Sequence, residues 1–223
     1  MVVPSRSPAF RIVPDYRERY LMPPREDIAL FLDLETTGSD KELDEIIEIG
    51  VVALDTTKED VPEIRAFSSI VLPSAKAMHR LLSKKVVREM HEKNGLLDEL
   101  YAGIDEMNSG HLGPPRHNPI YVSNQLNLWL NEIAGTDDTH IPYGGSGVMH
   151  FDRPFIDKTF TLFGRRLTYW AHDVGPIRRA YVKAGGVNWP DQEVGKTHRA
   201  LDDARFHAEE WRFALRLFRG EEV

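Results

Sequence analysis

The sequence predicts a single α/β domain whose mixed central sheet begins with an antiparallel meander and is flanked by helices. Two patterns carry this prediction. Three short apolar segments follow one another with short connections in the first third of the chain. Later segments combine apolar residues at helical spacing with a further short strand. The chain has 223 residues, of which 41% are hydrophobic and 28% charged, so it can bury a substantial core.

The composition excludes several classes of protein. The chain contains no cysteine, which rules out disulfide scaffolds, thiolate zinc sites and thiol chemistry. Its 28 basic and 35 acidic residues give a net charge of −7, which argues against extensive coating of nucleic acid. No apolar run approaches the roughly 18–20 residues that span a bilayer, and the N-terminus lacks the layout of a signal peptide. We expect a soluble, cytoplasmic protein with no membrane partner.

Residues 1–27 are predicted to form a Pro-rich N-terminal arm, because they hold five of the 14 prolines. Within the arm, Tyr16, Arg17, Arg19 and Tyr20 interleave aromatic and basic side chains. Such side chains suit stacking on bases and neutralisation of phosphates. Three roles stay open for the arm: contact with nucleic acid, a strap across the domain or a dimer interface, and docking to a partner protein.

The first three elements are predicted as strands. Residues 28–34 form a nearly continuous apolar run, residues 46–54 are rich in Ile and Val, and residues 65–72 end at Pro73. The first strand is followed by a segment with turn chemistry, Thr36-Thr37-Gly38-Ser39-Asp40.

Helices and one further strand are predicted after the meander. The expected elements are helices at 83–91 and 96–107, an exposed loop at 108–119, a helix at 121–134, a strand at 140–143, a glycine-rich turn at 144–147 and a helix at 151–163. The last helix is the clearest, because apolar residues recur at steps of three and four from Ala200 to Phe218.

Two carboxylates at the end of the first strand are the first candidate for chemistry. Asp33 and Glu35 are two residues apart, so on a strand both side chains point to the same face. Like charges held this close are unfavourable unless a cation or a proton lies between them. Carboxylate oxygens suit Mg²⁺ or Mn²⁺ better than zinc. The alternative is a solvated strand end.

Three later residues extend this candidate site. Asp152 begins an amphipathic helix just after the glycine-rich turn, a position that an aspartate also takes merely to complement the helix dipole. His198 and Asp203 are five residues apart, about 140° around one continuous helix. They can face one centre if His198 belongs to the preceding loop, and Asp202 is then a cap or a surface group. We expect the other histidines, among them His172 and His207, to have no comparable group of candidate site residues around them.

Taken in order, these residues resemble the DEDD exonuclease superfamily in its histidine subclass. The motifs are Asp33-x-Glu35-x-Thr37-Gly38, then Asp152, then His198-x-x-x-x-Asp203. The resemblance runs from about residue 28 to residue 218. It implies a ribonuclease H-like exonuclease fold for a domain at residues 28–223.

The resemblance also implies an activity and a set of site residues. Asp33, Glu35, Asp152 and Asp203 would hold two Mg²⁺ or Mn²⁺ ions, and His198 would act as general base. The reaction would be 3′–5′ hydrolysis of single-stranded DNA or RNA with release of nucleoside 5′-monophosphates. Further substrate contacts are expected from the backbone near the strand end and from two aromatic rings, namely Thr36, Thr37, Gly38, His91 and Phe151. For His91, a surface position on a short helix is the alternative.

The substrate length is predicted from departures within the family pattern. Ser39 stands where oligoribonucleases have an apolar wedge, and Trp170 stands where they have a phosphate-capping arginine. Gly175 and Pro176 replace the hydroxyls of that cap. We therefore expect an exonuclease for strands of ordinary length. The alternatives are an oligoribonuclease-type enzyme and a polymerase-associated proofreading or repair subunit. A homodimer is common among relatives, and a non-enzymatic binding module is disfavoured because all five expected catalytic residues are present.

Overall fold

Five strands form one mixed sheet in the order β3-β2-β1-β4-β5. The structure is a computed structural model that describes residues 24–109, 116–136, 139–192 and 196–222. β1 (Ile28–Thr36), β2 (Ile46–Asp55) and β3 (Glu63–Ile70) pair antiparallel, which confirms the predicted meander. β4 (Ile141–Gly145) and β5 (Leu167–Asp173) continue the sheet in parallel from β1.

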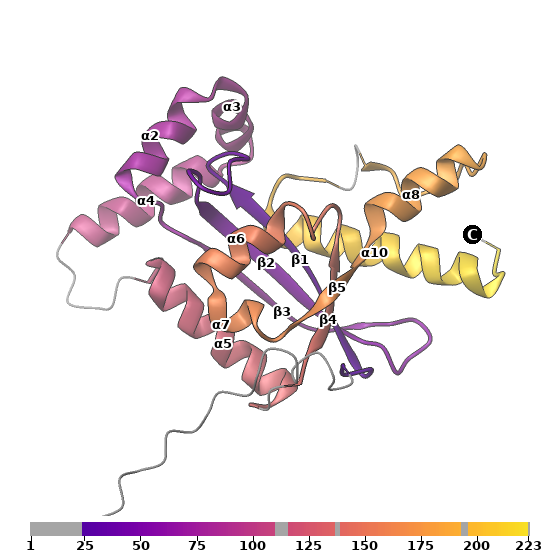
Figure 1. The fold of residues 1–223 in the computed structure, drawn as a ribbon. Helices are drawn as coiled ribbons and strands as arrows, with labels where there is room; N and C mark the ends of the chain where they lie inside the picture. Colours follow the sequence, from indigo (N-terminus) through magenta and orange to yellow (C-terminus); the bar gives the residue numbers. More distant parts are fainter. Residues whose placement is uncertain (1–23, 110–115, 137–138, 193–195, 223) are drawn as a thin grey trace, which may run out of the picture.

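Helices cover both faces of the sheet (Figure 1). Alternate residues of β1, such as Leu30 and Leu32, join a core with α5 (Pro119–Ala134), α6 (Asp152–Thr159) and α7 (Thr161–Gly164). Phe31 points the other way and packs with Ala208 of α10 (Ala200–Arg219). Because side chains alternate along a strand, Asp33 and Glu35 share the α10 side with Phe31.

Three helices gather at one end of the sheet, with α4 beside α2 and α3 (Figure 1). They are α2 (Ala75–Ser83), α3 (Lys85–Lys93) and α4 (Leu96–Asn108). Leu81 of α2 and Leu100 of α4 pack with Ile47 of β2 in a separate apolar cluster. These helices therefore flank the turn that follows β1. Among the described residues, no helix combines the length and apolar character needed to cross a membrane.

Several predicted boundaries are wrong. The helix predicted at 83–91 is α3 and runs from Lys85 to Lys93, because Lys84 before it is extended at φ −94° and ψ 93°. The helix predicted at 151–163 is two helices, separated by Phe160. The third strand ends at Ile70 instead of residue 72.

Three elements were not predicted: α2, β5 and α8. β5 is an edge strand whose residues are mostly half-buried, so its apolar signal is weak. α8 (Val174–Lys183) begins with Gly175 and Pro176, which read as breakers, although proline is favourable in a first turn.

The predicted arm and loop lie largely outside the described residues. Of the arm at residues 1–27, only the last four residues are described, and Arg25 is bonded through its backbone N–H to the carbonyl of His140 at 2.9 Å. Of the loop predicted at 108–119, residues 110–115 are not described, and Pro119 already belongs to α5.

Asp44 is a buried carboxylate that fixes the turn after β1. It accepts hydrogen bonds from Thr37 Oγ1 at 3.2 Å and from the backbone N–H of Asp40 at 3.0 Å. It also pairs with Arg80 at 3.0 Å and with Lys84 at 2.6 Å. Burial by itself would raise the pKa of Asp44, but the hydrogen bonds from Arg80 and Lys84 outweigh it and hold the pKa well below its usual range.

We expect Asp44→Asn to lower the free energy of unfolding by about 2–4 kcal/mol, because charge-assisted bonds of roughly 1.5–3 kcal/mol each are lost. The stabilisation from the depressed pKa is fully present above the unfolded pKa near 4 and is lost as the pH falls below it. Urea unfolding should therefore show a difference from wild type that shrinks below about pH 4. Asp98→Asn, on the exposed face of α4, is the control. An unchanged midpoint in Asp44→Asn at neutral pH would contradict the prediction.

Candidate active site

Four carboxylates supplied by three elements are largely withdrawn from solvent. Asp33 and Glu35 project from β1, Asp152 is the first residue of α6, and Asp203 lies in the first turn of α10. Glu35, Asp152 and Asp203 expose only 6%, 4% and 2% of their surface. The charge of Asp33 raises the pKa of each of the other three, so the four predicted carboxylates lie in one neighbourhood. Among the described residues, the group whose ligand atoms lie within 4.8 Å of one another is Glu35, His198 and Asp203.

A close backbone approach sets the position of Asp203. Gly50 of β2 pairs with Asp33 of β1, and the start of α10 lies directly over it. A Cβ atom on Gly50 would come within 2.4 Å of the backbone of Ala200 and Leu201. A glycine is therefore needed here, because any side chain would push α10 and Asp203 away from β1.

The clustered carboxylates favour their protonated forms when no cation is bound. Burial, followed by the charges of Asp33 and Asp203, raises the pKa of Glu35 to about 9. Burial and then Asp33 also raise the pKa of Asp152 and of Asp203. Lys196 opposes all three shifts, and sequence reasoning did not identify this lysine near the site.

The donor set fits a divalent cation. One ligand atom from each of Glu35, His198 and Asp203 can lie within 4.8 Å of the other two. Buried carboxylates that repel one another are stabilised by a cation between them. Carboxylate oxygen is the donor that Mg²⁺ and Mn²⁺ prefer.

We expect the protein in EDTA to lose thermal stability as the pH rises from about 5 to about 9. The folded pKa of Glu35 is about 9, so the folded protein keeps a proton that the unfolded chain has released. The stability that Glu35 contributes is therefore fully present below its unfolded pKa. This contribution is lost as the pH rises toward its folded pKa. Adding Mg²⁺ or Mn²⁺ should flatten the slope, because a cation takes the place of the proton. Melting temperatures that are independent of pH in EDTA would contradict this prediction.

His198 lies in the loop before α10, as its spacing from Asp203 requires. Its side chain is exposed and its backbone has a positive φ of 56°. Asn94 donates its side-chain amide to the His198 carbonyl. The backbone N–H of Thr197 donates to Asp203 Oδ1 at 2.9 Å. The loop is thus tied both to the end of α3 and to a candidate ligand.

Arg199 anchors the other side of this loop. It pairs with Glu48 of β2 at 2.8 Å and with Glu99 of α4 at 2.9 Å. Glu48 also accepts the backbone N–H of Ala200 at 2.9 Å. Asp202, predicted to be a cap or surface group, is exposed and accepts a hydrogen bond from Thr197 Oγ1 at 3.1 Å.

The segment Thr36–Gly38 forms a buried turn beside the carboxylates. Thr36 Oγ1 donates to the Gly38 carbonyl at 2.7 Å, and Lys84 Nζ donates to the Thr37 carbonyl at 3.2 Å. Gly38 has φ 153°, and a Cβ atom there would lie 1.8 Å from Lys84 Nζ. The backbone angle favours glycine, and a side chain here would also displace the Lys84 amine from the turn. The side chains and much of the backbone of this turn are thus engaged internally, which holds it rigid beside the carboxylates.

The two aromatic candidates have different surroundings. His91 of α3 is fully buried, so the surface position considered for it is wrong. Its Nε2 lies 3.8 Å from Glu35 Oε2, and burial, partly opposed by the Thr36 backbone, lowers its pKa to about 4. Phe151 is half-buried and packs against Phe155, with 5.4 Å between ring centroids.

The expectation that His207 has no candidate site residues around it is wrong. His207 is fully buried on α10, with Nε2 at 3.4 Å from Asp33 Oδ1 and Nδ1 at 2.9 Å from Glu210 Oε2. Burial alone would lower the pKa of His207, but the contacts with Asp33 and Glu210 raise it. The spacing Asp203, His207, Glu210 follows one face of a helix. Polar residues at this spacing, beside the apolar stripe of α10, are the sequence signal that could have identified His207 and Glu210.

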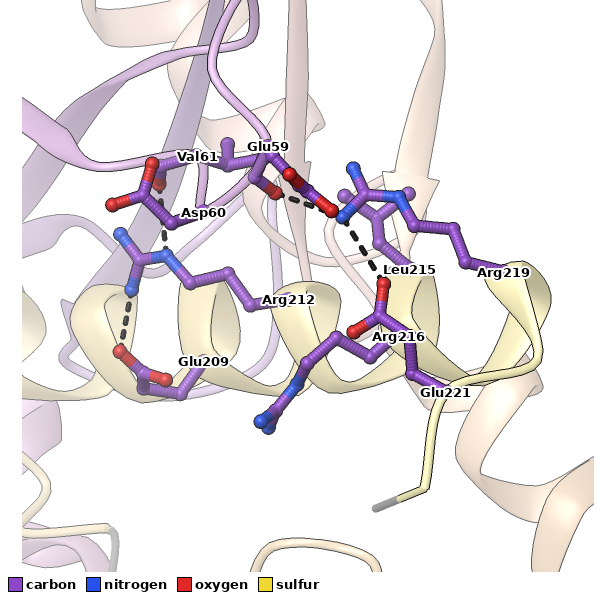
Figure 2. A pocket seen from close by; sticks show the side chains of 9 residues that line it. All are labelled: Glu59, Asp60, Val61, Glu209, Arg212, Leu215, Arg216, Arg219 and Glu221. Atoms are coloured by element: carbon purple, nitrogen blue, oxygen red, sulfur yellow. Dashed lines mark hydrogen bonds and ion pairs between the residues drawn. The ribbon is translucent and has the colours of Figure 1, made fainter.

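A cavity of about 520 Å³ lies at the other end of α10, by the β2–β3 connection (Figure 2). Arg212 of this cavity bonds the Val61 carbonyl at 2.8 Å and pairs with Glu209 at 2.5 Å (Figure 2). With a rise of 1.5 Å per residue, Arg216 lies about 20 Å along the helix from Asp203. The cavity is therefore separate from the carboxylates.

Known sequences similar to this chain include exonucleases. A family model described as Exonuclease matches residues 30–107. An oligoribonuclease of Leifsonia xyli subsp. xyli is 32% identical over 180 residues, which cover 79% of this chain and 77% of that protein. A DNA polymerase III PolC-type protein of Thermotoga petrophila is 27% identical over 187 residues, which cover 80% of this chain but 11% of that protein.

Solved structures share the fold. Exonuclease I of E. coli, in complex with a dT13 oligonucleotide, superposes with a TM-score of 0.54 at 13% identity and covers 87% of this chain. Cell-death related nuclease 4 superposes with a TM-score of 0.51 at 14% identity and covers 86% of this chain. The chain spans 43% and 64% of those two proteins, respectively.

Proposed function

The chain belongs to the DEDD superfamily of 3′–5′ exonucleases, in the histidine subclass that includes oligoribonucleases, and on this premise we propose a specific reaction. The enzyme removes nucleotides one at a time from the 3′ end of single-stranded DNA or RNA and releases nucleoside 5′-monophosphates. The observation that carries the proposal is the meeting of four withdrawn carboxylates next to a loop histidine.

Each site residue has a role in this proposal. Asp33, Glu35, Asp152 and Asp203 would hold two divalent ions, and their carboxylate oxygens favour Mg²⁺ or Mn²⁺. Bound ions would supply charge stabilisation for an in-line displacement at phosphorus. The carboxylates would fix the positions of the bound ions. They are held in place because the start of α10 packs tightly against Gly50 of β2.

His198 acts as the general base and takes a proton from the attacking water. Its exposure supports this role, since a base must reach both solvent and the reacting group. The bonds from Asn94 and Thr197 hold the loop backbone while the imidazole stays accessible. The backbone around Thr36 and Thr37 is assigned to the terminal 3′-hydroxyl, and the half-buried Phe151 lines the scissile end. His91 is fully buried beside Glu35 and presents no surface to a substrate in this structure.

Strands of ordinary length are the proposed substrates. Asp173 caps α8 and accepts the backbone N–H groups of Gly147 at 2.9 Å and Gly175 at 3.0 Å. A carboxylate there disfavours a 5′-phosphate, although a free helix N-terminus would attract one. Trp170 is half-buried and packs edge-on against His172, with 5.1 Å between ring centroids, so it supports the core instead of capping a short substrate.

Oligoribonuclease-type activity on very short RNA is the second candidate, favoured by the 32% identity to an oligoribonuclease over most of both chains. Similarity to part of a PolC-type polymerase favours association with a polymerase or repair partner. We also propose that the protein forms a homodimer and that residues 1–24 dock to the polymerase or repair partner. Deleting residues 1–24 tests them through oligomeric state and activity.

One assay tests the reaction. Single-stranded DNA, single-stranded RNA and a dinucleotide, each 5′-labelled, are incubated with the protein in Mg²⁺, Mn²⁺ or EDTA. The proposal expects stepwise shortening from the 3′ end with either metal, none in EDTA, and slower cleavage of a strand blocked by a 3′-phosphate. Activity that persists in EDTA would overturn the metal-dependent mechanism. Faster turnover of the dinucleotide than of a strand of roughly ten nucleotides would establish the oligoribonuclease alternative.

A further inference from the structure

A buried polar pair, Glu210 and His207, lies on α10 behind the candidate ligand Asp33. The Glu210 side chain has no solvent exposure, and its Oε1 accepts three hydrogen bonds. The donors are Arg178 Nη1 at 2.5 Å, Trp189 Nε1 at 2.7 Å and Gln192 Nε2 at 2.7 Å. Its Oε2 lies 2.9 Å from His207 Nδ1. Glu210 is therefore fixed on one side and presents its other oxygen to the imidazole.

The second ring nitrogen of His207 faces Asp33. Nε2 is buried, has no hydrogen bond among the described residues, and lies 3.4 Å from Asp33 Oδ1. This separation is slightly longer than a normal hydrogen bond. A carboxylate faces each ring nitrogen, Glu210 at Nδ1 and Asp33 at Nε2, and both nitrogens donate when the ring is the imidazolium. A buried N–H group that stays unbonded is unfavourable. The position of the ring, locked by Glu210, thus favours a bond to Asp33 as soon as that carboxylate settles by a few tenths of an ångström.

We propose that His207, held by Glu210, is a positioning residue that orients the carboxylate of Asp33 for cation binding. The inference rests on the proposed function, because it treats Asp33 as a metal ligand. A carboxylate has two oxygens, so an anchor on Oδ1 restricts rotation of the group and leaves Oδ2 for a cation. Groups that orient ligands in this way typically change metal affinity by about 10–100-fold.

The arrangement also joins two ligand-bearing elements. α10 supplies the candidate ligand Asp203 and, one and two turns later, the residues that orient Asp33 on β1. Since α10 packs over Gly50, directly beside Asp33, a rigid helix holds both carboxylates in one register. Placement of ligands by packed side chains on regular elements is more exact than placement by loops.

The test compares two substitutions of His207 that keep different nitrogen positions. His207→Asn keeps an amide near Nδ1, which still meets Glu210 but does not reach Asp33. His207→Gln places its amide near Nε2, where it can donate to Asp33. Isothermal titration of each protein with Mn²⁺, without substrate, should show affinity about 10–100-fold weaker for His207→Asn. His207→Gln should recover most of that loss. The apparent Mn²⁺ requirement of the exonuclease reaction should rise by the same factor.

Two further variants keep the inference falsifiable. Glu210→Gln replaces the anchor with an isosteric group and should weaken Mn²⁺ binding in the same direction, so it serves if His207→Asn does not fold. His172→Gln is the matched control, because His172 is a half-buried histidine near α10 that packs on Phe31 and Trp211, away from the carboxylates. Melting temperatures in EDTA report folding separately from metal binding.

The outcomes separate this inference from the proposed function. Wild-type Mn²⁺ affinity in folded His207→Asn, or equal weakening in the Asn and Gln variants, overturns the positioning role and leaves the exonuclease proposal intact. A wild-type protein that neither binds Mn²⁺ nor needs a metal for cleavage overturns the proposed function, and the inference with it.

Discussion

Asp33→Asn is expected to lower exonuclease turnover by about 10³-fold or more, because each 1.36 kcal/mol of lost transition-state stabilisation is a tenfold loss of rate and a bound metal supplies several kcal/mol. Asp33 is central to the site. Its charge raises the pKa of Glu35, Asp152 and Asp203, and the His207 ring lies against it. Steady-state cleavage of a labelled single strand at saturating Mn²⁺ measures the effect.

The same substitution should leave the fold intact and make it more stable in EDTA. Removing the charge of Asp33 relieves repulsion among buried carboxylates, and each kcal/mol of relief raises the melting temperature by about 2–4 °C in a protein of this size. Asp202→Asn is the control, because Asp202 is the exposed neighbour of Asp203 and should retain activity. Turnover within a few-fold of wild type in Asp33→Asn would remove Asp33 from the site.

His198→Ala is expected to reduce turnover by about 10²–10⁴-fold, the range contributed by a general base. Its affinity for Mn²⁺ should change much less than its turnover, because the carboxylates supply most of the donors. Fold stability should also be nearly unchanged, since the imidazole is exposed and the loop is held by Asn94 and Arg199.

Single-turnover rates with prebound strand, measured across pH, separate chemistry from binding for this variant. His79→Ala provides the matched control, because His79 is an exposed histidine on α2 away from the carboxylates. A His198→Ala protein with undiminished single-turnover rate would assign the proton transfer to another group. A lower affinity for the strand with an unchanged chemical step would make His198 a substrate contact only.

Patterns of short range predicted much of the fold. The meander was identified from apolar runs bounded by turn residues, and α10 from apolar residues at steps of three and four, because both signals repeat within a few residues. The break at Lys84 and the edge strand β5 were missed. Lys84 leaves the helix where its amine also meets Asp44 and the Thr37 carbonyl, and neither partner is visible from the residues around it.

For the site, the sequence by itself determined which side chains are available for chemistry and that Asp33 and Glu35 share one face. The i, i+2 relation follows from strand geometry alone. The tertiary structure decided which further residues surround them. His91, predicted as a substrate contact with a surface position as the alternative, is buried beside Glu35, and His207 lies between Asp33 and Glu210. These contacts join elements far apart in the chain, and burial depends on what packs over a residue, so no local periodicity specifies them.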